Sequence, residues 1–516
     1  MNKKTNIPIG GAWGGMVVWR RFLLSIGCAL VFFIPPFGGQ AQNTSNGTTE
    51  FSIETTGSAS SGKFTPFWIV SNKYGVIPLE ANNAFLRVGL FHRQSYGNGL
   101  QWSAGLDALT VTPRYNNLYV QQLYAAIQYK CLHLTVGSYE NYTSLWDKEL
   151  SSGDLVHSPN ARPIPEINLS VPSFTTIPFT KKRLQYRGNI SVGRSFDSQY
   201  LQQIINDKEF YINNILWHTK FLQLRLIDLE NKFPLTAVLG LHHAAQWGGV
   251  STNPTIGKLP QSFKDLIRII LGSEGGADAG LGDQINALGN HYGSYDLQFG
   301  YLHNAFSVYL YWQHFFDDHS GMEFRNAADG LWGLQVELPN FAWFNKIVVE
   351  YVDSRNQSGP IHHIQFDHDR YPGYGGGNDD YYNHGVLRDG YSYTGGVSYF
   401  NRGIGPPLIT SPEYNENGCL GFQNNRIRAF HIGFQGYLSK QISYRLLSTF
   451  AEGWGTMTAP FLKKKDTFSC AAKISWRPPR LADWLFTSEV ATDIGSMYAR
   501  NAGIAISIKK TGLINR

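Results

Sequence analysis

Short stretches of this chain alternate apolar and polar residues, and the alternation recurs over several hundred positions. Residues 295–301 place Tyr295, Leu297, Phe299 and Tyr301 on one face and Asp296, Gln298 and Gly300 on the other. The same period of two runs through 101–108, 431–438 and 503–508. Such a period puts successive side chains on opposite faces of a β-strand. One apolar face and one polar face are typical of a transmembrane strand between lipid and a wet lumen.

A single continuous apolar run lies near the start of the chain, from Phe22 to Ile34, directly after two arginines. The run is about thirteen residues long, whereas a spanning helix needs about 20. Its basic flank and the small residues up to Ala41 predict a signal peptide over 1–41. Cys28 makes lipid attachment an alternative, although the apolar run continues beyond it. Without longer apolar runs, the mature region 42–516 is expected to enter the membrane only as strands.

The pattern therefore predicts an all-β membrane protein, an antiparallel transmembrane β-barrel of about 16 to 18 strands. Aromatic residues near strand ends support this class, and we expect an outward position for Tyr295, Tyr301, Tyr309, Tyr311 and Trp312. A soluble sandwich or propeller also alternates, but it does not require outward aromatics, and the chain shows no propeller-like repeat. A barrel of this width leaves room for a channel or a plug.

The composition agrees with that of a barrel wall and argues against some classes of binding partner. Aromatic residues make up 14% of the chain and charged residues 16%, the latter below the average of about 25%. Removal of the signal peptide takes four basic residues and no acid, which lowers the formal charge from +6 to about +2. Nucleic acid is therefore not a predicted partner. Three cysteines remain, Cys131, Cys419 and Cys470, without the spacing of a disulfide framework or a zinc site.

Some segments do not follow the period of two. Residues 260–271 carry apolar side chains at helical spacing between a proline and Gly272, which predicts a short amphipathic helix. A second helix is predicted near 198–207. Both helices are expected to plug or cap the lumen, with a helix on the membrane surface as the alternative. The proline-rich segment 160–178 is predicted to be an inward-folded loop or a crossing, because proline cannot donate to a central ladder.

The segment 365–394 combines flat aromatic rings with short polar side chains, and we interpret it as a large extracellular loop. Aromatic faces can cover the C–H side of a sugar ring, and short polar groups can bind its hydroxyls. The candidate stacking residues are Tyr374, Tyr381, Tyr382 and Trp247, and the candidate polar contacts are Asn378, Asp379, Asp380 and Arg388. Two alternatives stay open: the loop only occludes the pore, and Trp247 is an interfacial anchor.

The spacing of the acidic and histidine residues does not match that of a metal site or a catalytic pair. Asp367 and Asp369 precede the acidic residues of the loop, but their spacing does not match an EF-hand. The adjacent histidines at 242–243 would face opposite sides of a strand. Asp317 and Asp318 are candidate glycosidase carboxylates that also face apart, and no Gly-x-Ser-x-Gly elbow is present. We therefore predict no metal, no cofactor and no enzymatic activity, with an outer-membrane hydrolase as the least favoured alternative.

Several short patches follow one another along the chain, at 158–165 (Ser-Pro-Asn-Ala-Arg-Pro-Ile-Pro), 240–249 (Gly-Leu-His-His-Ala-Ala-Gln-Trp-Gly-Gly), 259–263, 289–296, 316–321 and 329–334. In their order and spacing they resemble the capsule assembly Wzi family of outer-membrane proteins. The resemblance implies an 18-stranded barrel with a helical bundle. It also implies a surface lectin that holds capsular polysaccharide at the cell surface. The chain departs from the usual barrel ending because it finishes at Arg516 without a C-terminal aromatic residue.

We therefore expect an outer-membrane lectin of a Gram-negative bacterium that binds surface polysaccharide and helps assemble or anchor the capsule. Its expected partners are polysaccharide, outer-membrane lipid and the polysaccharide export machinery. A diffusion porin is the alternative, since the sequence does not show whether the lumen is closed.

Overall fold

The computed structural model describes residues 46–113, 115–205, 209–228, 233–285, 287–326, 329–360, 362–363, 375–387 and 391–514. Eighteen antiparallel strands form one sheet that closes on itself, because β26 pairs with β1 from Glu50↔Leu513 to Ser61↔Ala502. The prediction of an antiparallel barrel is confirmed. The predicted signal peptide lies outside the described residues.

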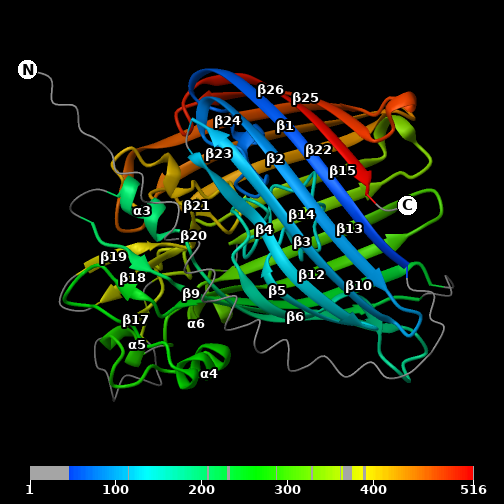
Figure 1. Cartoon of the computed structure of the whole chain (residues 1–516). Coiled ribbons are helices and arrows are strands. Elements are labelled where there is room, and N and C mark those ends of the chain that lie inside the picture. The colour runs from blue at the N-terminus through cyan, green and yellow to red at the C-terminus, as the bar shows by residue number, and fades with distance from the viewer. Residues whose placement is uncertain are drawn as a thin grey trace, which may run out of the picture. The chain divides into compact units, whose positions relative to one another are not determined.

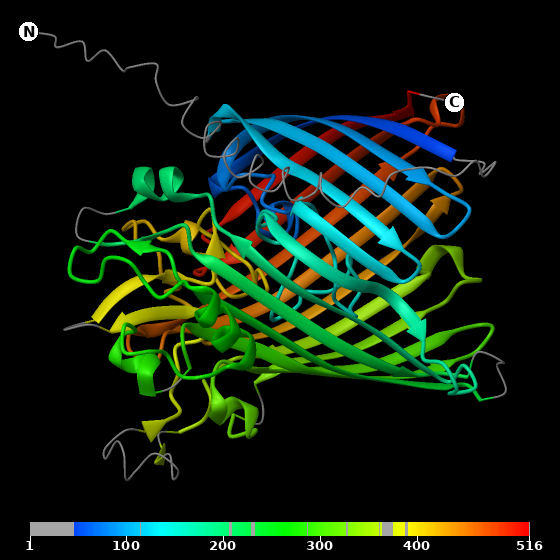
Figure 2. The same cartoon turned by 60° about the horizontal axis from the view of Figure 1, so that its bottom comes forward.

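The wall follows chain order, with each strand hydrogen-bonded to the next (Figures 1 and 2). Its first nine strands are β1 (Asn46–Phe64), β2 (Glu80–Ser95), β3 (Leu100–Thr112), β4 (Tyr115–Tyr129), β5 (Leu132–Ser138), β6 (Glu166–Thr176), β7 (Leu184–Arg194), β9 (Leu216–Leu226) and β10 (Leu235–Trp247). The other nine are β12 (Asn290–Leu302), β13 (Ser307–Phe316), β14 (Gly330–Glu337), β15 (Lys346–Asp353), β22 (Ile427–Ser439), β23 (Ile442–Gly455), β24 (Pro460–Trp476), β25 (Trp484–Gly495) and β26 (Asn501–Leu513).

Short hairpins join the strands at one end of the barrel, and most of the connections at the other end are long. We call these the hairpin end and the loop end. Figure 1 shows the labelled helices and the small sheets gathered at the loop end. The helices are α2 (Phe67–Val70), α3 (Ser198–Ile204), α4 (Phe263–Leu271), α5 (Leu281–Ile285) and α6 (His319–Met322). In outer-membrane barrels short turns face the periplasm and longer loops face outward, so the loop end is the outer end.

Four further two-stranded sheets lie in the long connections. They pair β8 (Ile212–Asn213) with β11 (Val250–Ser251), β16 (His362–His363) with β17 (Gly375–Gly376), β18 (Asn383–Leu387) with β19 (Tyr391–Gly396), and β20 (Ser398–Tyr399) with β21 (Arg402–Gly403). Three 3₁₀ turns cover Ala342–Phe344, Pro412–Tyr414 and Pro479–Leu481. Among the described residues no helix is long and apolar enough to span a membrane.

The predicted faces are correct on β3, β12, β22 and β26, the four strands that contain the alternating segments. On β12 Asp296 is buried toward the lumen, while Phe299 and Tyr301 are exposed on the outer surface. On β13 the exposed Leu310 marks the outer face, which Trp312 shares as predicted. The prediction is wrong for Tyr309 and Tyr311, which lie on the opposite, inward face, Tyr311 buried and Tyr309 half-buried. Aromatic residues occupy both faces of this strand, so composition alone could not set the phase of its alternation.

The proline-rich segment 160–178 divides into two parts. Residues 160–165 are folded inward, as predicted, but β6 is a strand of the wall, which corrects the prediction for 166–176. The pairing of β6 with β7 is interrupted between Val171 and Thr175. Pro172 sits in that interruption, where its missing N–H breaks no ladder hydrogen bond.

Candidate functional site: a closed outer mouth above a hollow vestibule

The connection 139–165 enters the lumen between β5 and β6 and is tied to the wall at Glu350 of β15. Glu350 accepts hydrogen bonds from the Ser151 hydroxyl (2.7 Å), the Ser152 backbone N–H (2.7 Å) and the Tyr311 hydroxyl (2.6 Å). The ring of Tyr311 stacks on Trp146 at 4.4 Å between centroids. Buried polar groups need such partners, so this connection is held as a plug in one position.

The helix α2 forms the second part of the plug, and all four of its residues are buried. The Phe67 backbone N–H donates to Asp493 on β25 (3.0 Å), and Trp68 Nε1 donates to Thr449 on β23 (3.1 Å). Neither strand is adjacent to α2 in sequence. These long-range contacts confirm that a short helix fills the lumen, although the chain uses 67–70, which showed no helical periodicity long enough to be predicted.

Tyr381 and Tyr382, two predicted stacking residues, are almost fully buried. The Tyr381 hydroxyl accepts from the Ser358 N–H (2.8 Å) and from Asn326 Nδ2 (2.7 Å). The Tyr382 hydroxyl donates to the carbonyl oxygen of Leu155 in the plug (2.8 Å). Neither ring is an exposed platform in this structure, where both join the outer loops to the wall and plug. Sugar contact by these two residues stays a prediction.

Three predicted polar contacts do lie at the rim of the loop end. Asn378 is exposed in the left-handed backbone region (φ 53°), and its N–H donates to Gly359 O (2.8 Å). Asp380 accepts from Asn425 Nδ2 (2.5 Å). Burial and the neighbouring Asp318 raise the pKa of Asp379 to about 7. Sugar contact by these residues stays a prediction.

The other predicted loop contacts fall outside the described residues. Tyr374 and Arg388 belong to this group, as do Asp367 and Asp369 of the weighed calcium site. Within the described part of the chain, no group of three or more metal-ligating side chains is arranged to hold a metal ion.

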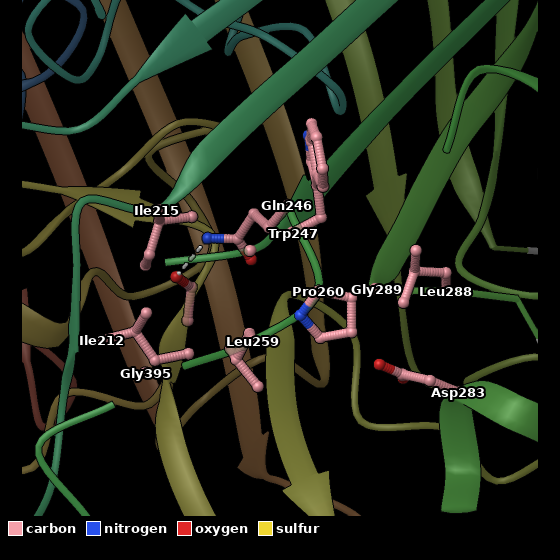
Figure 3. Close-up of a pocket in the computed structure, with 12 residues that line it drawn as sticks. Ile212, Ile215, Gln246, Trp247, Leu259, Pro260, Asp283, Leu288, Gly289 and Gly395 are labelled. Carbon is pink, nitrogen blue, oxygen red and sulfur yellow. Dashed lines mark hydrogen bonds between the residues drawn. The ribbon is translucent and has the colours of Figure 1, made fainter. Parts of the chain in front are cut away.

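Trp247 lies at the outer rim of β10 beside a small cavity of about 20 Å³ (Figure 3). Figure 3 shows Gln246 turned toward the loop at Gly395, where its Nε2 donates to Gly396 O (3.1 Å). Such a volume holds about one or two water molecules, and Trp247 is buried against Ile269 and Leu288. The Trp247 ring is therefore a packing residue in this conformation, and the cavity is too small for a sugar ring.

A larger cavity of about 300 Å³, the vestibule, lies in the lumen toward the hairpin end. Its charged lining consists of Lys73, Arg87, Lys148, Arg445, Lys473, Lys509, Glu54, Glu149 and Glu489. A second hollow of about 180 Å³ shares Glu149, Arg445 and Lys473 with it and is also lined by Tyr437 and Tyr444, beside the β22–β23 hairpin. The hairpin half of the lumen is thus hollow and lined by charged and polar side chains.

Ion pairs across the vestibule join the plug to the wall. Arg445 on β23 binds Glu149 of the plug (2.9 Å) and Glu489 on β25 (2.8 Å). Lys73, which follows α2, lies 3.5 Å from Glu489. Six basic and three acidic side chains line the vestibule, so its ion pairs position the plug and its lining keeps a positive excess of three charges.

Of the two carboxylates weighed for catalysis, Asp318 has a structural role. Asp318 accepts from the Gly321 N–H (3.1 Å) and caps α6. Burial and the neighbouring acids raise the pKa of Asp317 well above its ordinary value. One of the two carboxylates is therefore engaged by a helix end.

Comparisons with known proteins agree with this architecture. The family model of the capsule assembly protein Wzi matches residues 32–398, and no curated protein sequence matches. A solved structure of Wzi from Escherichia coli, an outer membrane protein involved in group 1 capsule assembly and described as a carbohydrate-binding β-barrel, is 12% identical with a TM-score of 0.54. The alignment covers 89% of this chain and 83% of that one.

Two Pseudomonas aeruginosa structures share the barrel more distantly. OccK5 (OpdH) is 8% identical with a TM-score of 0.45, covering 91% of this chain and 99% of its own. OprD is 8% identical with a TM-score of 0.43, covering 91% and 96%. These likenesses concern the fold alone. The family model, in contrast, spans more than half of the sequence, and the chain belongs to the Wzi capsule assembly family of the outer membrane.

Proposed function

We propose that this protein binds polysaccharide at its loop end and helps to hold the capsule at the cell surface. One observation carries the proposal beyond family membership: the outer half of the lumen is occupied by a plug that is hydrogen-bonded to β15, β23 and β25 of the wall. A tethered plug suits a surface that binds a ligand, whereas a diffusion channel needs a continuous open path.

The sugar-binding surface is assigned to the rim of the loop end. Asn378, Asp379 and Asp380 offer amide and carboxyl groups there, and such groups bind sugar hydroxyls. Tyr374 and Arg388 remain the proposed aromatic and cationic contacts of the same loop. The hairpin end, which faces the periplasm by the usual rule, is where the export machinery would meet the barrel.

A diffusion porin is the second candidate, and the vestibule is the observation that favours it. A cavity of about 300 Å³ would serve as the inner half of a pore if the plug moved aside. The two candidates differ in what crosses the membrane, so conductance distinguishes them.

The test measures binding and conductance on one preparation. Detergent-folded protein is titrated with the polysaccharide of its own host, and the same sample is inserted in a planar bilayer. Saturable binding with little conductance is expected, and Asn378→Ala should weaken binding. Lys440→Ala, at the exposed β22–β23 hairpin, is the matched control. Steady conductance without saturable binding would overturn the proposal.

A further inference from the structure

The helix α4 is well defined at both ends. Ser262 caps its N-terminus: the hydroxyl accepts from the Asp265 N–H, and the Asp265 carboxylate accepts from the Ser262 N–H (2.9 Å). Gly272 ends the helix in the left-handed region (φ 65°), which glycine adopts without strain. A nine-residue segment with both caps holds a fixed pair of faces.

This helix lies on the outside of the barrel wall. On β10 the exposed Leu239 and Leu241 mark the outer face, and the pairings of β10 show no register break up to Gln246. Ala245 and Trp247 are therefore on that outer face, where Ile269 of α4 covers them. Figure 1 shows α4 outside the barrel, below the green strands. The prediction that this helix plugs or caps the lumen is therefore wrong, and its position outside the wall leaves the stated alternative, a helix on the membrane surface.

Polar groups of the outer wall lie beneath the helix. Lys220 shares the outer face of β9 with the exposed Leu222, and its ammonium donates to the carbonyl oxygen of Ile270 at the C-terminal end of α4. His243 on β10 is hydrogen-bonded to His291 on β12 (2.8 Å). Lipid offers no partner to such groups. The helix and the loop after it therefore shield a polar part of the wall.

The opposite side of α4 has no cover. Phe263 is 78% exposed, Ile267 42% and Leu271 71%, whereas Asp265 and Ile269 are buried. The three exposed side chains are four residues apart, so they form one stripe along the helix. A stripe of large apolar side chains on a helix that is itself well packed indicates a surface with an apolar partner.

The height of the helix identifies that partner. Ten residues separate Leu235 at the β9–β10 hairpin from Ala245 beneath α4. At ~3.4 Å per residue and a strand tilt of about 40°, they rise about 26 Å along the barrel axis. The apolar band of an outer-membrane barrel is about 25 Å tall. The helix therefore lies at the outer boundary of that band.

We propose that α4 is an interfacial helix whose apolar stripe inserts into the outer leaflet of the membrane. The stripe continues the lipid-facing surface that Leu239 and Leu241 begin. Lys264, exposed beside Phe263, is placed to meet anionic headgroups. The helix extends the width of the barrel at the lipid boundary and fixes how far the loop end stands above it. This inference is independent of polysaccharide binding.

The test places an environment-sensitive fluorophore on single cysteines, in a background where Cys131, Cys419 and Cys470 are serine. Ile267→Cys and Phe263→Cys probe the stripe. Leu239→Cys is the lipid control, and Lys463→Cys, exposed near the loop end of β24, is the water control. Folding of each variant is checked by its compact migration on unheated gels. In vesicles, labels on the stripe should be quenched by lipids with a shallow nitroxide and be protected from iodide at least several-fold relative to Lys463→Cys.

Two results would overturn the proposal. Iodide quenching of the stripe labels equal to that of Lys463→Cys would show that α4 stands in water. Protection that rises with protein concentration in detergent, without lipid quenching in vesicles, would show that a second copy of the chain covers the stripe instead. Loss of polysaccharide binding, in contrast, leaves both readouts unchanged and bears only on the proposed function.

Discussion

The two halves of the lumen differ although one wall surrounds both. Toward the loop end, inward side chains such as Glu350 and Tyr311 meet a plug and are fully engaged. Toward the hairpin end, inward side chains such as Arg445 and Lys473 border a vestibule of about 300 Å³. Inward polar residues are therefore compatible with a filled lumen as well as an open one. Each half of the lumen is filled or hollow according to whether a connection long enough to enter the lumen begins at that end.

The largest effect on stability and conductance is expected from Glu350→Ala. This change should release the plug, so that the loop-end half of the lumen becomes open like the hairpin-end half. The change leaves buried donors on Ser151, Ser152 and Tyr311 without an acceptor, at a cost of about 3 kcal/mol. The apparent unfolding temperature should fall and conductance in planar bilayers should rise. Glu337→Ala near the β14–β15 hairpin is the control. An unchanged conductance together with a lower unfolding temperature would show that other contacts hold the plug.

A pH effect confined to the loop end is the next largest. The pKa of Asp379 is raised from 3.8 to about 7, so the folded loop binds a proton more tightly than the unfolded one. Its stabilisation is complete below about pH 4 and is lost as the pH rises toward 7. Hydrogen exchange of 375–387, corrected for intrinsic rates, should be several-fold faster at pH 8 than at pH 5.

The matched variants for this pH effect are Asp379→Asn and Asp278→Asn. Asp379→Asn should remove most of the difference between pH 5 and pH 8, because amides do not titrate. Asp278 is an exposed acid in another loop. The Asp278→Asn variant should therefore keep the difference in exchange rate between pH 5 and pH 8. Equal pH dependence in all three proteins would place the responsible group elsewhere.

A smaller effect is expected from Tyr382→Phe, which tests whether this ring packs or binds sugar. Loss of the hydrogen bond to Leu155 O should cost about 1 kcal/mol, with unchanged affinity for polysaccharide. The measurements are thermal unfolding and a binding titration. A large loss of affinity at constant stability would restore the ring as a sugar contact.

The smallest effect is expected in the vestibule at Lys148→Ala. This exposed lysine lies 4.9 Å from the ring centre of Tyr74, a contact that contributes about 0.5 kcal/mol. Arg445→Ala should destabilise far more, because it leaves the buried Glu489 with only the longer contact to Lys73. Similar effects of the two substitutions on thermal unfolding would show that the plug does not depend on the ion pairs.

Local periodicity was sufficient to predict the faces of β3, β12, β22 and β26. Asp296 faces the lumen and Phe299 faces outward because a strand alternates strictly, and that rule needs no knowledge of neighbours. The helix at α4 was also predicted, since its spacing, its cap and Gly272 are all local signals. On β13 aromatic residues occupy both faces, so alternation could not decide which of them face outward. The expected outward positions of Tyr309 and Tyr311 were therefore wrong.

Only the tertiary structure decided what lies inside the barrel and what lies outside. The burial of Tyr381 and Tyr382 depends on Ser358, Asn326 and Leu155, which are far away in the chain. Likewise the apolar residues of α4 predict an amphipathic helix, but not whether it faces the lumen or the lipid. Periodicity records that a face is apolar or polar, whereas its partner is set by packing between distant segments, which no local pattern encodes.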